Sequence, residues 1–103
     1  MLDKIMSFLG IKKVDVKALV EAGAIIIDVR TKAEYAGGHV KGSINIPLDQ
    51  IGNKLTKIRT MNAPIVTCCK SGARSGMAAS KLKSNGIEAY NGGGWTSVER
   101  ALR

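Results

Sequence analysis

The order of apolar and polar positions along this chain predicts several buried strands separated by helices. The run at 24–29 is almost entirely apolar and β-branched, which is typical of a strand buried on both faces of a parallel sheet. Three shorter extended segments follow at 43–46, 65–68 and 87–90. Strands that alternate with helices predict an α/β fold, with an open parallel sheet and helices on both of its faces.

Capping residues and apolar residues at helical spacing predict the helices. Asp15 is placed to cap a helix over 16–22, and Thr31 and Glu34 have the spacing of a capping box. Apolar residues at helical spacing predict a further helix over 48–59. Two more helices are expected at 75–85 and 95–102, and glycine-rich loops at 37–42 and 91–94.

The chain of 103 residues has the length of one compact domain with a single core. Residues 2–9 are expected to form a short amphipathic helix that docks against this domain. The first ten residues are too short and too interrupted for a secretory signal, and no apolar run approaches the ~20 residues of a membrane span. We therefore expect a cytoplasmic protein with no membrane partner.

The charge is strongly positive, with 16 basic and 8 acidic residues and a net charge of +8. These basic residues are spread along the chain, and the aromatic content of 4% offers no stacking platform for bases. We therefore expect a solvated basic surface rather than a nucleic-acid site. Such a surface would attract small anions.

The only two cysteines, Cys68 and Cys69, are adjacent, and adjacent cysteines rarely bridge each other. A structural disulfide framework is therefore excluded, which fits a reducing compartment. His39 is the single histidine, so no zinc site is expected, and we expect no metal or cofactor.

Candidate chemistry lies in the loop that follows the strand at 65–68. The sequence there is Cys69-Lys70-Ser71-Gly72-Ala73-Arg74-Ser75. Small residues after the cysteine let the backbone curl, so that successive N–H groups and a helix N-terminus point at one sulfur atom. Arg74 adds a planar fork of donors, Lys70 a mobile charge, and the Ser75 hydroxyl caps the helix or donates toward sulfur. This loop predicts a cysteine thiolate that acts as a nucleophile.

No partner base for Cys69 is evident, because nothing local places His39 beside it. A structural role in hydrogen bonding is expected for that histidine. A thiolate that attacks a sulfur centre needs no base, so the site favours sulfur transfer over peptide hydrolysis.

Five blocks of sequence occur in a fixed order from about residue 14 onward. They are Ile27-Asp28-Val29-Arg30, Glu34-Tyr35, Gly38-His39-Val40-Lys41-Gly42-Ser43-Ile44-Asn45-Ile46-Pro47, Cys69-Lys70-Ser71-Gly72-Ala73-Arg74-Ser75 and Gly93-Gly94. With these blocks the chain resembles the single-domain rhodaneses, a family of sulfurtransferases. The resemblance implies a rhodanese-like domain over 14–103, with a five-stranded open parallel sheet, and an N-terminal extension or short helix at 1–13.

The resemblance also implies a reaction. Cys69 would take a sulfane sulfur from a small anionic donor such as thiosulfate, hold it as a persulfide, and pass it to cyanide, a thiol or a protein acceptor. Residues that would bind the substrate or cradle the persulfide are Lys70, Ser71, Gly72, Ala73, Arg74 and Ser75. The blocks that contain Asp28, Arg30, Glu34 and His39 are usually considered fold-supporting. A monomer or weak homodimer is expected.

Two alternatives follow from the paired cysteines. Counted from Cys69 the motif is Cys-x4-Arg, the short loop of rhodaneses, but counted from Cys68 it is Cys-x5-Arg, the longer loop of phosphatases and arsenate reductases. The five-residue lead-in at 64–68 and the lack of a preceding histidine favour Cys69. Cys68 is then a small buried strand residue or a resolving thiol. The third hypothesis is a non-catalytic module that carries sulfur for a partner.

Overall fold

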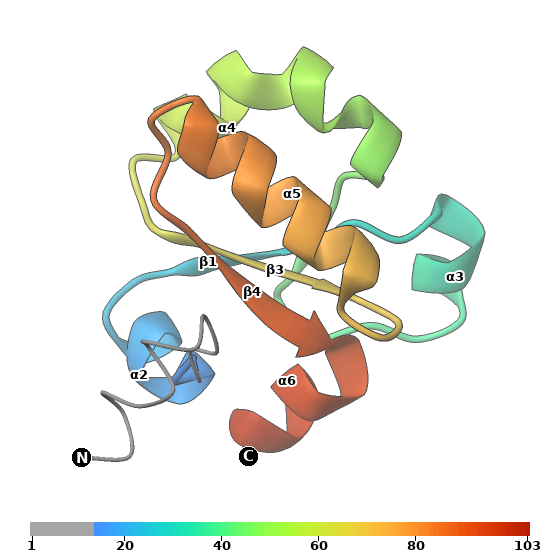
Figure 1. Ribbon diagram of the computed structural model, residues 1–103. Helices are drawn as coiled ribbons and strands as arrows, with labels where there is room; N and C mark the ends of the chain where they lie inside the picture. The colour runs from blue at the N-terminus through green and yellow to red at the C-terminus, as the bar shows by residue number, and fades with distance from the viewer. Residues whose placement is uncertain (1–13) are drawn as a thin grey trace.

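A computed structural model describes residues 14–103, and in this part of the chain four parallel strands form one sheet in the order β2-β1-β3-β4 (Figure 1). The strands are β1 (Ile25–Asp28), β2 (Ile44–Asn45), β3 (Ile65–Cys69) and β4 (Ala89–Gly94). The expected parallel α/β architecture is confirmed, but the expectation of five strands is wrong. The sequence itself offers four extended segments, and each of them becomes one of these strands. The fifth strand was implied only by the resemblance.

Helices cover both faces of the sheet, as predicted. On one face lie η1 (Leu48–Lys54), α4 (Leu55–Thr60) and α5 (Ala73–Ser84), and on the other lie α2 (Val16–Glu21) and α6 (Trp95–Ala101) (Figure 1). The short helix α3 (Lys32–Ala36) lies beyond the carboxyl end of β1.

Side-chain alternation along the central strands divides the core into two clusters. Ile27 and Ile65 point to the face covered by α5 and pack with its Leu82, whereas Ile26 and Val66 point to the opposite face. These two clusters lie on opposite faces because successive strand side chains point in opposite directions. Both faces of the sheet are therefore buried, which explains the apolar run at 24–29.

The predicted helix caps are present. The Asp15 carboxylate accepts a hydrogen bond from the Ala18 N–H at 3.0 Å. Thr31 and Glu34 form the reciprocal capping box of α3. The segment predicted as one helix at 48–59 is instead the 3₁₀ helix η1 followed by α4, because Asp49, Gly52 and Asn53 are weak α-helix formers.

The glycines at 92–94 belong to β4, so the loop expected at 91–94 is wrong. Thr67 is in register with Asn91 but Cys69 with Gly94, which leaves one extra residue in β4, a β-bulge. A Cβ atom on Gly94 would lie 2.8 Å from the Lys70 carbonyl oxygen. The glycine is required there because the backbone of β4 lies directly against the loop after β3.

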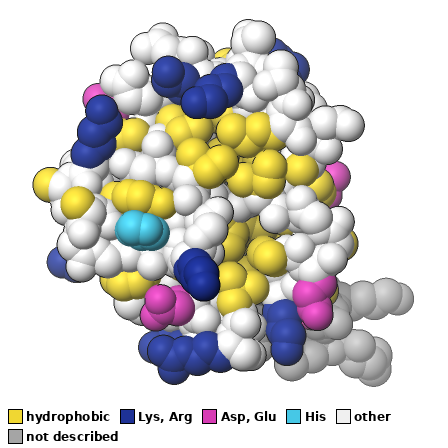
Figure 2. Space-filling view, turned by 180° about the vertical axis from the view of Figure 1, so that it is seen from behind, with side chains coloured by type: hydrophobic (Ala, Val, Ile, Leu, Met, Phe, Trp, Pro, Cys, Tyr) yellow, Lys and Arg dark blue, Asp and Glu magenta, His cyan; other side chains and the backbone are white. Residues whose placement is uncertain are grey.

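The helix expected at 2–9 lies outside the described residues. Within 14–103, no helix combines the length and the apolar composition that crossing a membrane requires. On the face shown in Figure 2, Lys and Arg side chains lie in separate groups, which agrees with the spread of basic residues along the sequence.

Candidate active site

Cys69 is the last residue of β3, and α5 begins four residues later at Ala73. In open parallel sheets, ligands bind beyond the carboxyl ends of the strands, which is where this cysteine lies. Gly72 caps α5 with a φ of 105°, a left-handed conformation that glycine adopts without steric cost. The chain therefore turns sharply and brings the N-terminus of a 12-residue helix back over the sulfur.

Three donors or potential donors surround the Cys69 sulfur. The Gly72 N–H donates to Sγ at 3.0 Å and the Ser75 N–H at 3.4 Å, while the Ser75 hydroxyl lies 3.3 Å away. Burial alone would raise the pKa of Cys69. The hydrogen bonds from the Ser75 hydroxyl and from the N–H groups of Ser75, Gly72 and Ser71 outweigh burial and lower this pKa below its ordinary value. Because the loop donates to the charged form, it favours the thiolate.

The loop also covers the sulfur. Cys69 is only 1% exposed, and Ser75 is completely buried beneath it. Lys70, Ser71 and Ala73 are exposed on the outside of the loop, and Gly72 and Arg74 are half-buried. A reagent therefore meets the outer loop residues before it reaches the sulfur.

Arg74 is held by a partner that the sequence did not assign to it. Its guanidinium donates two hydrogen bonds to the Glu34 carboxylate, from Nη1 at 2.7 Å and from Nη2 at 3.0 Å. The Arg74 bonds, with backbone and side-chain bonds from Thr31, lower the pKa of Glu34 to about 2. The ion pair links α3 to the N-terminus of α5. Because a guanidinium carries five N–H donors, three remain for an anion.

A buried ion pair joins Asp28 and Arg30 at the carboxyl end of β1. Arg30 donates from Nε and Nη2 to the Asp28 carboxylate at 2.8–3.0 Å, and this interaction raises the pKa of Arg30. Its Nη2 also donates to the Gly38 carbonyl at 2.6 Å, and the guanidinium lies 4.9 Å from the centre of the Trp95 ring. Asp28 and Arg30 therefore tie the end of β1 to the loop after α3 and to α6. This placement agrees with a fold-supporting role.

Cys68 points to the opposite face of the sheet from Cys69. It packs with Val66 and Val98 and is completely buried. Burial, together with the nearby Asp28 carboxylate, raises the pKa of Cys68 to about 12. The N–H donors of the loop surround the Cys69 sulfur and not that of Cys68, which argues against Cys68 as the nucleophile of a Cys-x5-Arg loop. Cys68 also points away from the Cys69 sulfur, which argues against a resolving role.

His39 lies on the surface, stacked on Tyr35 with ring centroids 3.8 Å apart. Its Nδ1 is 2.8 Å from the Tyr35 carbonyl oxygen. These contacts agree with the structural role in hydrogen bonding that we expected for His39.

Two residues near the sulfur, Asn91 and Thr67, are not among those that the sequence predicts at the site. Asn91 of β4 lies with its Oδ1 2.6 Å from the Ser75 hydroxyl. Thr67 of β3 donates from its hydroxyl to the Ser75 carbonyl at 2.8 Å. Asn91 lay in a segment interpreted as a glycine loop, so only the strand register brings it to the site.

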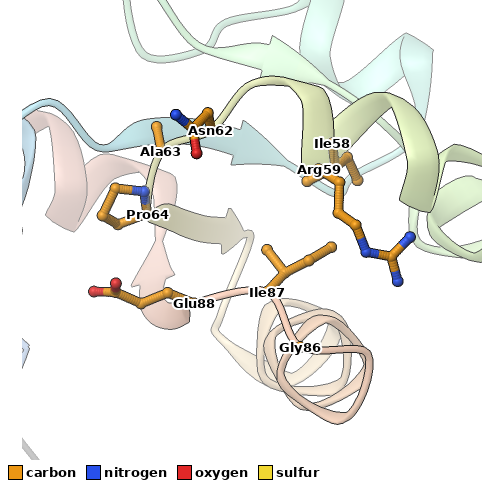
Figure 3. Close-up of a pocket in the computed structure, with 8 residues that line it drawn as sticks. All are labelled: Ile58, Arg59, Asn62, Ala63, Pro64, Gly86, Ile87 and Glu88. Atoms are coloured by element: carbon orange, nitrogen blue, oxygen red, sulfur yellow. The ribbon is translucent and has the colours of Figure 1, made fainter.

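Two hollows elsewhere on the surface do not include the sulfur. One, of about 340 Å³, lies at the opposite end of β3, between Pro64, Arg59 and Ile87 (Figure 3). The other, of about 620 Å³, lies along β2 and is lined in part by Lys32, Lys54 and Lys57. Neither hollow is lined by a cysteine. The Cys69 loop therefore remains the candidate active site.

A parallel α/β domain in which a cysteine sulfur accepts N–H bonds from a loop between a strand and a helix is typical of a class of thiol-dependent enzymes and sulfur carriers. The family model described as "Rhodanese-like domain" matches residues 13–101. The chain belongs to the rhodanese family, whose sulfurtransferase members are among its relatives.

Individual relatives agree with this assignment. The chain is 45% identical over 69 residues to "Uncharacterized protein YqhL" of Bacillus subtilis, a match that covers 66% of this chain and 54% of YqhL, about half its length. It is 36% identical over 74 residues to "Thiosulfate sulfurtransferase PspE" of Escherichia coli, covering 70% of this chain and 71% of PspE. The solved structure "rhodanese with anions from E. coli" superposes with a TM-score of 0.66 at 32% identity, covering 73% of this chain and 91% of that one.

Proposed function

We propose that this protein is a sulfurtransferase that carries sulfane sulfur as a persulfide on Cys69. The observation that carries the proposal is the Cys69 sulfur itself, which accepts N–H bonds from Gly72 and Ser75 at the N-terminus of α5 and is only 1% exposed. The name of the PspE relative, a thiosulfate sulfurtransferase, supports thiosulfate as the first donor to test.

In the first half-reaction the Cys69 thiolate attacks the outer sulfur of thiosulfate. A bond forms between Sγ and that sulfur, the S–S bond of thiosulfate breaks, and its electron pair leaves with sulfite. The dianion approaches a surface with a net charge of +8, and the free N–H donors of Arg74 and the exposed Lys70 lie beside its path. The residues proposed to bind substrate are therefore those of the loop, 70–75.

The persulfide extends the cysteine outward by one S–S bond of about 2.05 Å. Its terminal sulfur carries the negative charge and is proposed to lie within reach of the N–H groups of residues 70–74. In the second half-reaction an acceptor such as cyanide or a thiolate attacks this terminal sulfur. The bond to Sγ breaks, and its electron pair returns to Cys69 as the thiolate.

The adjacent cysteines supply a matched pair of variants for the test. Wild-type protein incubated with thiosulfate and freed of excess donor is expected to gain the mass of one sulfur atom, located on Cys69 by peptide mapping. Cys69→Ala should gain none, while Cys68→Ala, which removes an equal thiol from the opposite face, should gain as much as wild type. No added sulfur on wild type, or an equal gain on Cys69→Ala, contradicts the proposal.

The rate at which small acceptors discharge the persulfide form then distinguishes an enzyme from a sulfur carrier. Rapid return to the thiol with cyanide or a small thiol supports a sulfurtransferase with small acceptors. Loading without rapid discharge would leave Cys69 as the sulfur-bearing residue and would contradict turnover with these acceptors, as expected of a module that serves a protein partner.

A further inference from the structure

The side chain of Asn91 has only one orientation compatible with its neighbours. Its Oδ1 accepts the Gly93 N–H at 3.0 Å, and its Nδ2 donates to the Gly72 carbonyl at 3.1 Å. Reversing the amide would set a donor against the Gly93 N–H and an acceptor against the Gly72 carbonyl. The atom that Asn91 presents to Ser75 is therefore an oxygen, which only accepts.

The Ser75 hydroxyl lies between this oxygen and the Cys69 sulfur. Its Oγ is 2.6 Å from Asn91 Oδ1 and 3.3 Å from Cys69 Sγ, and the residue is completely buried. A hydroxyl has one proton to donate. When Ser75 donates it to Asn91, its oxygen is left to accept the S–H of a Cys69 thiol. When Ser75 donates to the sulfur, Asn91 Oδ1 keeps only the Gly93 N–H.

The charge on Cys69 Sγ changes twice in each proposed cycle. It is negative in the free thiolate, neutral in the persulfide, whose charge resides on the terminal sulfur, and negative again after transfer. A negative Sγ attracts the Ser75 proton, whereas a neutral Sγ does not compete with the short bond to Asn91.

From these contacts we propose that Asn91 is a positioning residue that competes with Cys69 Sγ for the single Ser75 proton. Asn91 receives the proton while Sγ is neutral and releases it when Sγ becomes charged. This inference deepens the proposed function and rests on it for the catalytic cycle. The competition itself is a property of the thiol and needs no sulfur donor.

Two substitutions at Asn91 are expected to act in opposite directions. Asn91→Ala removes the competing acceptor, so Ser75 donates fully to sulfur and the pKa of Cys69 falls. Asn91→Asp strengthens the competing acceptor and adds a negative charge, so the pKa of Cys69 rises. A shift of roughly one pH unit either way, a tenfold change in thiolate fraction, is the expected size for one hydrogen bond.

The measurement is the ultraviolet absorbance of the thiolate against pH, in a Cys68→Ala background so that one thiol titrates. Charged groups near the site, Arg74 with its partner Glu34 and the loop residue Lys70, are unchanged in all variants. Thermal unfolding shows whether each variant is folded at the pH values used.

Opposite shifts support the inference, whereas shifts in the same direction, as from a loosened loop, overturn it. Ser75→Ala supplies a second criterion: Asn91→Ala added to this variant should no longer lower the pKa of Cys69, and a persistent decrease overturns the inference. Failure of the proposed function is seen separately, as absence of sulfur loading on wild type by thiosulfate.

Discussion

At the scale of single residues, the adjacent thiols Cys68 and Cys69 differ in the properties that control reactivity. Cys69 receives N–H bonds from Gly72 and Ser75, and its pKa is lowered. Cys68 lies among apolar side chains on the other face of the sheet, and its pKa is raised to about 12. One step along a strand therefore separates a thiol whose ionised form is favoured by hydrogen bonds from a thiol whose ionised form is disfavoured by burial.

Alkylation is expected to distinguish the two thiols. Native protein should take up one equivalent of iodoacetamide, on Cys69, and a second equivalent on Cys68 only after unfolding in denaturant. Because the thiolate is the reactive form, the rate at Cys69 should rise with pH and reach half of its plateau at a lower pH than for an ordinary thiol, whose pKa is about 8.5. Peptide mapping after labelling identifies the site. Labelling of Cys68 in folded protein would contradict the assignment of the two faces.

At the scale of elements, the ion pair between Glu34 and Arg74 joins α3 to α5 across the mouth of the site. Both side chains are about one-third exposed, so the pair is screened by solvent and contributes modestly to stability. Its greater effect is on how many Arg74 N–H groups are available to a sulfur donor. The Glu34 carboxylate accepts bonds from two of them, and Arg74 is the arginine proposed to bind that donor.

Glu34→Gln tests this link while preserving the capping box, since glutamine also serves at that position. The freed guanidinium should bind thiosulfate more tightly, so we expect the KM for thiosulfate to fall severalfold.

The same variant tests the effect of Glu34 on stability. Glu34 has a pKa of about 2 in the folded protein, below its unfolded value, so its contribution to stability is complete above about pH 4.5 and is lost as pH falls toward 2. Urea unfolding should therefore show a shallower acid decline for the variant.

The matched control is Glu99→Gln, at an exposed pair in which Oε1 lies 3.9 Å from Arg103 Nη2. This change should leave both the KM and the acid decline unaltered. An unchanged KM for Glu34→Gln would show that the carboxylate does not compete with the donor.

Local signals in the sequence were sufficient for most elements and insufficient for contacts between them. The capping box of α3, the buried run of β1 and the cysteine loop are each encoded within a few residues, so pattern and spacing reveal them. The glycines of β4 are typical of a loop, and a sequence does not show that the Lys70 carbonyl oxygen lies 2.8 Å from where the Cβ of Gly94 would be. The pairs Arg74–Glu34 and Ser75–Asn91 are 40 and 16 residues apart, and only the fold brings them together.

At the scale of the whole molecule, the positive charge affects how often an anionic sulfur donor reaches the protein. It does not act on the transfer of sulfur to Cys69 itself. A net charge of +8 on a small domain attracts a dianion from beyond direct contact, and salt screens this attraction over a Debye length of about 10 Å at 0.1 M. The basic groups are distributed over the surface, as one face illustrates (Figure 2), so the effect belongs to the molecule as a unit.

The rate at which thiosulfate loads Cys69 should therefore fall severalfold between low salt and about 0.5 M salt. Alkylation by iodoacetamide, which is neutral, should change far less over the same range, and stopped-flow or quenched mass measurements can follow both reactions. An equal response of the neutral and the anionic reagent would assign the salt effect to the thiolate itself rather than to attraction at a distance.

The covering of the Cys69 sulfur by its own loop also determines which atom of a persulfide an acceptor meets. Attack on the outer sulfur transfers it, whereas attack on the inner sulfur would expel hydrosulfide and leave the acceptor joined to the protein as a mixed disulfide. Because Cys69 is only 1% exposed, we expect the inner sulfur of the proposed persulfide to be shielded and the outer sulfur to be the one that an acceptor reaches. The tight turn at Gly72 would thus impose regioselectivity, keeping the protein from being trapped by the thiols to which it delivers sulfur.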